Sequence, residues 1–348
     1  MQSSPVIPRS PLLSYGLPDG VALLSGADSR WGLIEARGAE ATRFLHSQLT
    51  NDLALLQPGE ARLAAFCSAK GRMQASFVVV RTLHTAAEDS YLLLCRQDLL
   101  ANILKRLTMF KLRSQLTLTD VSAEIAVYGL LGEAARQAVQ GATLPLWAHQ
   151  QQEQRQLVWL YPAVDLESHV PRALCIQPAG LPAPAGASVG VQDWELSEVR
   201  SGVATISLAT WEAFVPQMLN YESVGGVSFK KGCYPGQEVV ARSQFRGAIK
   251  RRGCIAAGVL TAGAALPEAG QDIFLVPTAS ADEEIRAGEC GLIAQVASLP
   301  QDGFELIASL QLSAAEAASQ GLATLHAGSE TGPELLLLPL PYPLLEDI

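Results

Sequence analysis

The chain has 348 residues, of which 49% are hydrophobic and 17% are charged, and its formal net charge is −9. This length predicts two or three domains, and the composition is typical of a folded protein and excludes a largely disordered one. The acidic balance argues against nucleic-acid binding over the whole surface. Neither a signal peptide nor a run of eighteen apolar residues is found, so we expect no membrane span.

Short strands and two helices are predicted in the first 124 residues. The apolar residues of the two helices, at 44–53 and 99–110, recur at three-and-four spacing. Apolar, β-branched and alternating patterns predict strands at 21–24, 31–36, 63–67, 76–81, 91–95 and 116–119. The short connections favour α+β layers over a long parallel sheet.

A second α+β unit is predicted from residue 125 onward. Strands are expected at 125–131, 157–161 and 174–177, and helices at 133–139 and 165–173. The Pro, Gly and Ala residues of 178–190 predict a long loop or linker, which is followed by a helix at 192–200.

The C-terminal hundred residues show short strands separated by glycines and prolines. The expected strands are 254–260, 272–276, 292–299, 304–310 and 335–340, with a short helix near 314–319. This pattern predicts a small antiparallel barrel or sandwich.

Cys233 is the strongest candidate for chemistry. It lies between Gly232 and a Tyr-Pro-Gly turn, which predicts a loop, and Lys230 and Lys231 precede it. Neighbouring cations favour the thiolate, the nucleophilic and metal-binding form of cysteine. A free cysteine is more often a small buried hydrophobe, but these neighbours favour a functional thiol.

The positive charge of the chain is concentrated around this cysteine. Residues 228–252 hold seven lysines and arginines and a single acid, Glu238. This stretch predicts either a solvated basic face or a site for an anionic ligand or an RNA backbone.

Other site motifs are missing. The six cysteines form no C-x-x-C pair, so no metal site is predicted, and free thiols favour a cytoplasmic location. Phosphate-loop, dinucleotide, zinc-protease and nucleophile-elbow motifs are absent as well.

Residues 231–238 match the signature K-G-C-Y-x-G-Q-E of the YgfZ-type folate-binding proteins, which are related to the aminomethyltransferase of the glycine cleavage system. Further segments that resemble this family lie at 44–52, 67–72, 214–220, 225–229, 239–242, 245–247 and 339–342. The resemblance therefore extends over nearly the whole chain.

The resemblance implies an α+β, aminomethyltransferase-like three-domain fold around a central hole. We expect a ferredoxin-like N-terminal domain at 15–124, partly interleaved with 192–245, and a second α+β domain at 125–191. A segment at 192–250 would carry the folate site and the cysteine loop, and a C-terminal antiparallel β-barrel would occupy 251–348.

The resemblance also implies a function: a cytoplasmic factor that binds tetrahydrofolate or a derivative and supports iron–sulfur enzymes such as tRNA thiomethyltransferases. Whether tRNA is contacted directly is left open. Cys233 is then the functional thiol, with Lys231, Gln237 and Glu238 beside it in the signature. Two sets of folate contacts complete the expected site: Trp31 and Trp194 for the pterin, and Arg242 and Arg246 for the anionic tail.

One position departs from the family pattern. Where aminomethyltransferases and some family members have a glutamate that bonds the pterin edge, in a run such as R-I-E-A-G, this chain has Arg200. An arginine only donates hydrogen bonds, so it cannot replace that acceptor. Glu195 and Glu198, one helical turn apart, are the candidates to take over.

Two alternative functions are kept. One is a folate-dependent one-carbon transferase, which needs a carboxylate near the reacting nitrogens of the folate. The other is a non-catalytic RNA- or protein-binding module that uses the basic stretch at 230–252. No general base is evident, so we expect an accessory factor more than a conventional enzyme.

Overall fold

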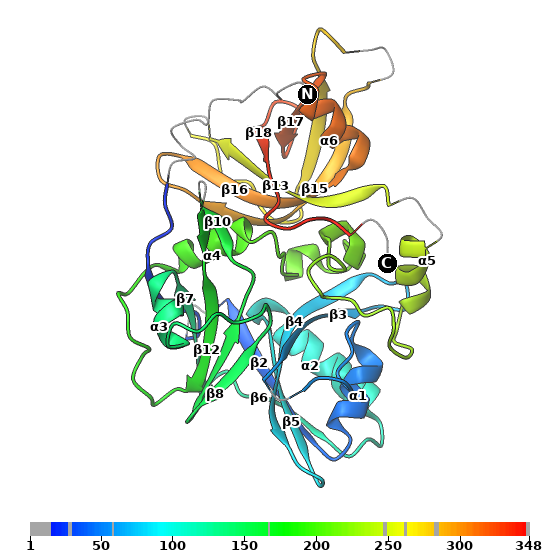
Figure 1. Cartoon of the computed structure of the whole chain (residues 1–348). Helices are drawn as coiled ribbons and strands as arrows, with labels where there is room; N and C mark the ends of the chain where they lie inside the picture. Colours follow the sequence, from blue (N-terminus) through cyan, green and yellow to red (C-terminus); the bar gives the residue numbers. More distant parts are fainter. Residues whose placement is uncertain are drawn as a thin grey trace.

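The computed structural model describes residues 15–26, 30–57, 59–165, 168–245, 249–260, 263–281 and 285–345. Figure 1 shows a β-barrel above two β-sheets that lie side by side. Irregular segments and the helix α4 (Val191–Arg200) lie between the barrel and the sheets.

The first sheet has five antiparallel strands in the order β3-β4-β5-β2-β6. Their bounds are Trp31–Gly38 for β2, Ala61–Cys67 for β3, Met73–His84 for β4, Asp89–Arg96 for β5 and Thr117–Asp120 for β6. The helices α1 (Ala41–Gln48) and α2 (Gln97–Lys111) pack their apolar residues onto one face of it.

Except for the exposed edge strand β6, the strands of this sheet are largely buried on both faces. In β2, Ile34 and Ala36 belong to the core beneath the helices, whereas Trp31 and Leu33 belong to a second core. Successive side chains of a strand point to opposite faces, so this division follows from the sequence spacing. The second core lies between the two sheets, and it also contains Trp194.

The second sheet has the order β1-β7-β12-β9-β8 and is likewise antiparallel. Its strands are β1 (Gly20–Leu23), β7 (Ile125–Leu131), β8 (His149–Gln152), β9 (Arg155–Trp159) and β12 (Arg172–Pro178). The helix α3 (Glu133–Ala138) packs against it. β1 precedes the first sheet in the sequence but pairs with β7, so the two sheets are interleaved along the chain.

The helix predicted at 165–173 is wrong. The hairpin of β10 (Ala163–Asp165) and β11 (Ser168–Val170) lies there, followed directly by β12. Pro171 lacks the N–H that a helix interior needs.

The predicted C-terminal barrel is confirmed. Six antiparallel strands close in the order β13-β16-β15-β14-β17-β18 around their own apolar core. They are β13 (Arg251–Val259), β14 (Asp272–Pro277), β15 (Gly288–Ser298), β16 (Gly303–Gln311), β17 (Ala323–Ala327) and β18 (Glu334–Leu338). The helix α6 (Leu312–Ser319) follows β16.

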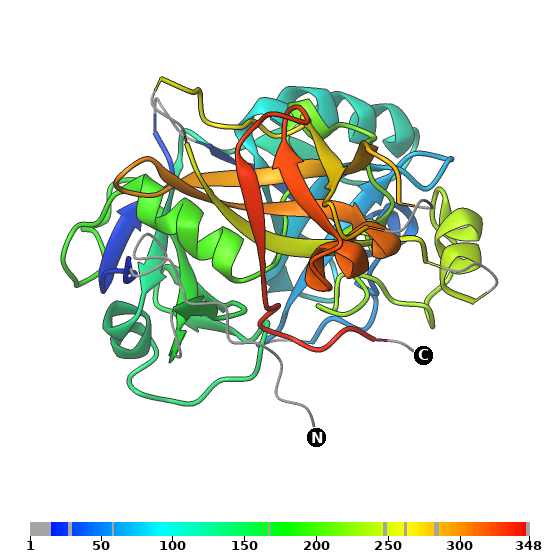
Figure 2. The same ribbon diagram turned by 90° about the horizontal axis from the view of Figure 1, so that it is seen from above.

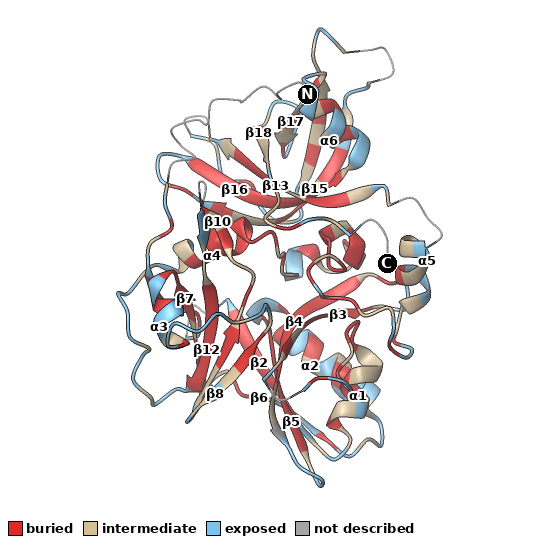
Figure 3. Ribbon diagram, viewed as in Figure 1, coloured by how far each residue is buried: buried red, intermediate tan, exposed pale blue. Residues whose placement is uncertain are grey.

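The chain between α4 and the barrel carries the short helices η2 (Leu208–Thr210) and η3 (Pro216–Leu219) and the helix α5 (Gln237–Phe245). Figure 3 shows that α4 is buried along most of its length, whereas α5 is largely open to solvent. Among the described residues, no helix has the length and apolar character that a membrane span requires.

Candidate functional site

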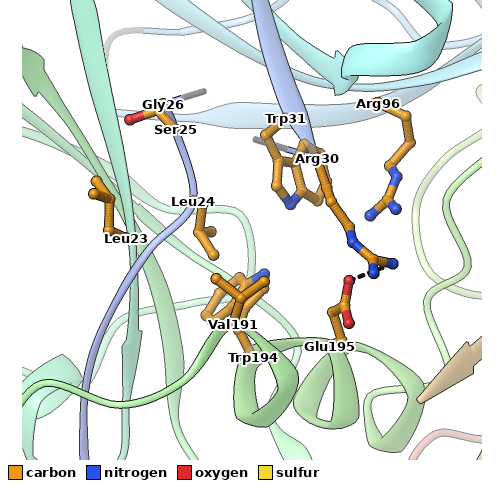
Figure 4. A pocket seen from close by; sticks show the side chains of 10 residues that line it. All are labelled: Leu23, Leu24, Ser25, Gly26, Arg30, Trp31, Arg96, Val191, Trp194 and Glu195. Carbon is orange, nitrogen blue, oxygen red and sulfur yellow. Dashed lines mark ion pairs between the residues drawn. The ribbon is translucent and has the colours of Figure 1, made fainter. Parts of the chain in front are cut away.

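A pocket of about 270 Å³ lies where Trp31 and Trp194 meet. Trp31 begins β2 and Trp194 lies in the first half of α4, and both side chains enter the core between the two sheets. The structure therefore brings together the two tryptophans predicted for folate. The lining residues, drawn in Figure 4, are Leu23, Leu24, Ser25, Gly26, Arg30, Trp31, Arg96, Val191, Trp194 and Glu195.

The indole of Trp194 is fixed from several sides. Its Nε1 donates to Oε1 of Glu198 at 3.0 Å, and the Arg172 guanidinium lies 4.5 Å from the ring centroid. At Gly129 of β7, an added Cβ would lie 2.2 Å from the Trp194 ring, so only glycine allows this close packing. Trp194, which is 1% exposed, is thus a rigid wall at the base of the pocket.

Three charged side chains, Glu195, Arg30 and Arg96, line the same pocket. Oε1 of Glu195 forms an ion pair with Nη1 of Arg30 at 2.7 Å, and Figure 4 shows Arg96 nearby, beside Arg30. Burial raises the pKa of Glu195, and Glu198 also raises it, while Arg30 and Arg96 oppose the shift. The pocket thus combines aromatic walls with one charged acceptor group and two charged donor groups.

Sequence reasoning missed both arginines. Arg30 directly precedes Trp31, and Arg96 is paired with Trp31 in the register of β2 and β5. The adjacency of Arg30 was a usable signal, but the position of Arg96 depends on a register between strands some sixty residues apart.

The three charged residues of α4 named in the sequence analysis have different surroundings. Glu195 lines the pocket with Val191 and Trp194, as their spacing of three and four residues predicts. Glu198 is fully buried, and its two oxygens accept from Trp194 Nε1 and from Gln295 Nε2 of the barrel at 3.0 Å each. Burial raises the pKa of Glu198 as well.

Arg200 points away from the pocket and toward the barrel. It forms ion pairs with Glu305 of β16 at 2.8 Å and with Asp165 of β10 at 2.7 Å, and its Nη1 donates to the Tyr15 carbonyl. All three side chains of this cluster are buried. Arg200 thus joins the barrel to the sheets, and it is not among the pocket's lining residues.

A second hollow adjoins the first at Trp31. It has a volume of about 450 Å³ and shares Ser25, Gly26 and Trp31 with the pocket just described. Its other walls are Gln97, Asp120, Ser122, Ala123, Ile125, Ala126 and Ala179. Asp120 is the only charged one of the described residues that line this second hollow, so the hollow suits neutral or hydrogen-bond-donating groups more than anions.

The Cys233 loop lies elsewhere. All six cysteines fall within the described residues, and Cys233 alone is exposed. Three contacts of Lys231 fix the loop. Its ammonium donates to the carbonyls of His46 and Leu49 at the end of α1, and it lies 4.7 Å from the Tyr234 ring. Burial lowers the pKa of Lys231 to about 8.

A close backbone approach fixes the other end of the loop. Gly236 has φ +81°, and a side chain there would lie 2.4 Å from the Ser68 carbonyl oxygen. The loop is therefore held between α1 and the turn that follows β3, with its thiol facing outward. Sequence reasoning located the loop but gave no sign that Lys231 is its buried anchor.

The remaining signature residues begin α5. Gln237 is half-buried, whereas the exposed Glu238 forms an ion pair with Arg242 at 2.6 Å. Arg242 lies on α5, far from α4 and its tryptophan pocket, and Arg246 lies outside the described residues. Figures 1 and 2 both place α4 and α5 far apart.

The basic stretch is less open than its sequence suggests. Lys231 is buried on backbone carbonyls, and Arg252 is buried in an ion pair with Glu222. Arg242 is paired with Glu238, which leaves Lys230, Lys250 and Arg251 as the cations without a recorded ion pair among the described residues. This arrangement weakens the case for a continuous RNA-binding face.

The pocket fits a folate better than a metal. A pterin is a flat ring with both donor and acceptor groups at its edge, which the indoles, Glu195 and the two arginines can match. Within the ranges that the structure covers, no three His, Cys, Asp or Glu side chains gather as metal ligands would.

Comparisons with known proteins agree with this architecture. The model of the GCVT N-terminal domain family matches residues 28–154. The aminomethyltransferase T of the glycine cleavage system from Bartonella henselae superposes with a TM-score of 0.58 at 14% identity, covering 96% of this chain and 88% of that one. The predicted aminomethyltransferase-like fold is therefore confirmed.

Sequence relatives identify the family. The tRNA-modifying protein YgfZ of Shigella sonnei (strain Ss046) is 30% identical over 280 residues, which is 79% of this chain and 82% of that protein. Its namesake from Escherichia coli O157:H7 (strain EC4115) is 31% identical over 281 residues, with the same coverage. The resemblance inferred from the signature is thus confirmed, and the chain belongs to the YgfZ family of tRNA-modifying proteins.

Proposed function

We propose that this protein is an accessory factor for tRNA modification, with Cys233 as its functional thiol. The observation that carries the proposal is the Cys233 loop: the one exposed cysteine is held by a buried lysine and by glycine contacts, on a protein related to tRNA-modifying ones. An anchored loop that presents a single thiol suits contact with another protein.

The second part of the proposal is that the tryptophan pocket binds tetrahydrofolate or a derivative. The aromatic walls suit the pterin, and Arg96, which has no recorded ion-pair partner in the described part of the chain, suits the anionic tail. Arg96 replaces Arg242 in this role, since Arg242 lies on α5, far from α4 and the pocket. A bound tetrahydrofolate would supply one-carbon chemistry at its ring nitrogens.

The third part concerns partners. We propose that the factor supports iron–sulfur enzymes, such as those that thiomethylate tRNA, and that its effect on tRNA passes through them. An exposed thiol is accessible to a partner protein's cluster, whereas the five other cysteines are buried or half-buried. Six free thiols also favour a reducing compartment such as the cytoplasm.

Complementation tests the role of the thiol. A strain that lacks its own family member would express wild type, Cys233→Ala or Cys254→Ala at matched levels, and thiomethylated tRNA would be measured by mass spectrometry. We expect Cys233→Ala to lose at least about 90% of the modification. Cys254→Ala, which alters a half-buried barrel cysteine, should keep it. Equal activity of both variants would reject the thiol as the functional group.

A one-carbon transferase is the second candidate, and the aminomethyltransferase-like fold favours it. Its chemistry needs a carboxylate near the folate nitrogens, and Glu195, ion-paired with Arg30, is the one carboxylate among the lining residues of the pocket. Incubation with tetrahydrofolate and a one-carbon donor distinguishes the two: an aminomethyl donor should give methylenetetrahydrofolate with release of ammonia, and an N-methyl donor should give 5-methyltetrahydrofolate with release of the demethylated amine. Either product would support the transferase.

A further inference from the structure

We propose that Glu195 is the acceptor that binds the amino and ring N–H edge of the pterin, in place of a carboxylate at position 200. This inference rests on the proposed folate binding in the tryptophan pocket. In this proposal, one residue of α4 determines which heterocycle the pocket prefers. Three observations on that helix support it.

First, Arg200 is unavailable to a ligand. Its Nε and Nη2 donate to Glu305, and its Nη1 donates to Asp165 and to the Tyr15 carbonyl. Residues five apart on a helix are separated by about 140° around its axis, so position 200 and position 195 face different neighbours. The residue at position 200 therefore contributes to joining the domains and not to the pocket.

Second, Glu198 is already occupied. One of its oxygens accepts from the Trp194 indole and the other from Gln295, and the residue is 3% exposed. A ligand at this carboxylate would have to displace the bond that fixes Trp194. Glu198 therefore positions the wall of the pocket.

Third, Glu195 presents a carboxylate at the pocket itself. It directly follows Trp194, it lines the cavity, and it is 9% exposed. Its recorded ion pair uses Oε1 toward Arg30, whose own side chain is 55% exposed and so remains hydrated without this partner. Figure 4 shows the carboxylate directed toward the space that Arg30 and Arg96 border.

These groups define a ligand class. A carboxylate only accepts hydrogen bonds and a guanidinium only donates them. An edge that carries two donors next to a carbonyl, as the 2-amino-4-oxo edge of a pterin does, matches Glu195 together with an arginine. A 2,4-dioxo edge, as in a lumazine, puts a carbonyl oxygen where the amino group would be, and it would face the carboxylate unfavourably.

The test measures binding of two tail-free ligands, 6-hydroxymethylpterin and 6-hydroxymethyllumazine, to the full chain by calorimetry. The wild type should bind the pterin about 10- to 100-fold more tightly, because a hydrogen bond to a charged group is lost in the lumazine. In Glu195→Gln the preference should fall below about 3-fold, because the amide can donate as well as accept. Glu133→Gln, the same change on the exposed face of α3, should behave as wild type.

The outcomes separate this inference from the proposed function. If the wild type binds neither tetrahydrofolate nor the pterin, folate binding itself is rejected. If it binds both, but Glu195→Gln keeps the full preference, Glu195 is not the acceptor. Should that variant fail to fold, equal binding of pterin and lumazine by the wild type would overturn the inference without any variant.

Discussion

In the tryptophan pocket, Trp194 itself is held by other side chains: Arg172 lies over its ring, and Glu198 accepts a hydrogen bond from its Nε1. At the Cys233 loop, by contrast, the thiol is exposed, and the buried Lys231 anchors the loop. The pocket is therefore a buried site whose specificity depends on several fixed side chains. The loop is a surface site in which one atom can be changed while its support stays intact. The helices beside the two sites, α4 and α5, lie far apart in Figures 1 and 2, so the functions of the two sites can be tested separately.

The largest effect should come from the charge cluster that joins the pocket's helix to the barrel. Arg200→Met leaves Asp165 and Glu305 without their partner in a buried setting. Loss of one partner from a buried ion pair costs about 3–5 kcal/mol, and we expect the free energy of unfolding to fall by this amount. Urea unfolding measures it.

The control for this prediction is Arg37→Met, which breaks an exposed ion pair with Glu88 and should change stability little. Where Arg200→Met remains folded, it should bind tetrahydrofolate within about 3-fold of wild type, because Arg200 is not a pocket residue. A selective loss of folate affinity in a stable variant would contradict this assignment.

A smaller effect is expected at the anchor of the cysteine loop. Lys231→Met removes the donor from the carbonyls of His46 and Leu49, and buried acceptors left unpaired cost about 1–3 kcal/mol. The loop should loosen, so the rate of Cys233 alkylation by iodoacetamide should change several-fold while folate affinity does not. Lys230→Met, at the exposed neighbour, should leave the rate within about 2-fold of wild type.

The pocket should respond to pH in a way that the loop does not. Because burial raises the pKa of Glu195 above the ordinary 4.5, the folded protein holds this proton more tightly than the unfolded chain does. As the pH falls from 7 to 4.5, protonation of Glu195 should therefore stabilise the folded protein. The same protonation should weaken binding of a ligand that needs the carboxylate.

This pH effect is measured as the difference between wild type and Glu195→Gln from pH 7 to pH 4.5. The charged groups that act on Glu195 are Arg30, Arg96 and Glu198. We expect pterin affinity to fall about 3- to 10-fold more in wild type than in the variant. Parallel pH profiles would show that Glu195 does not contact the ligand.

The sequence predicted the parts of this molecule that depend on local pattern. The apolar spacing of α2, the strand pattern of β2 and the glycines and prolines that separate the strands of the barrel are all features of neighbouring residues in the chain. The loop around Cys233 was predicted for the same reason, because glycine and proline beside it favour a loop, and the structure adds that its thiol is exposed.

What the sequence did not predict depends on non-local pairing. Arg96 lines the pocket because β5 pairs with β2 in the register that places it opposite Trp31. Lys231 is buried because it packs against the end of α1 and donates to the Leu49 carbonyl there. A run of basic residues gives no sign of which members are buried or paired. Arg252, Lys231 and Arg242 all belong to that run, yet Arg252 pairs with Glu222, Lys231 donates to backbone carbonyls, and Arg242 pairs with Glu238 on the surface.

The smallest effect, and a direct test of the separation of the two sites, is expected at Arg242. Its ion pair with Glu238 is exposed and lies on α5, so Arg242→Ala should leave both the unfolding temperature and tetrahydrofolate affinity nearly unchanged. Arg96→Gln should instead weaken tetrahydrofolate about 5- to 10-fold while tail-free pterin loses less, because the guanidinium is expected to meet the anionic tail. The reverse ranking of these two variants would place the tail near Cys233 and would unite the two sites that the structure separates.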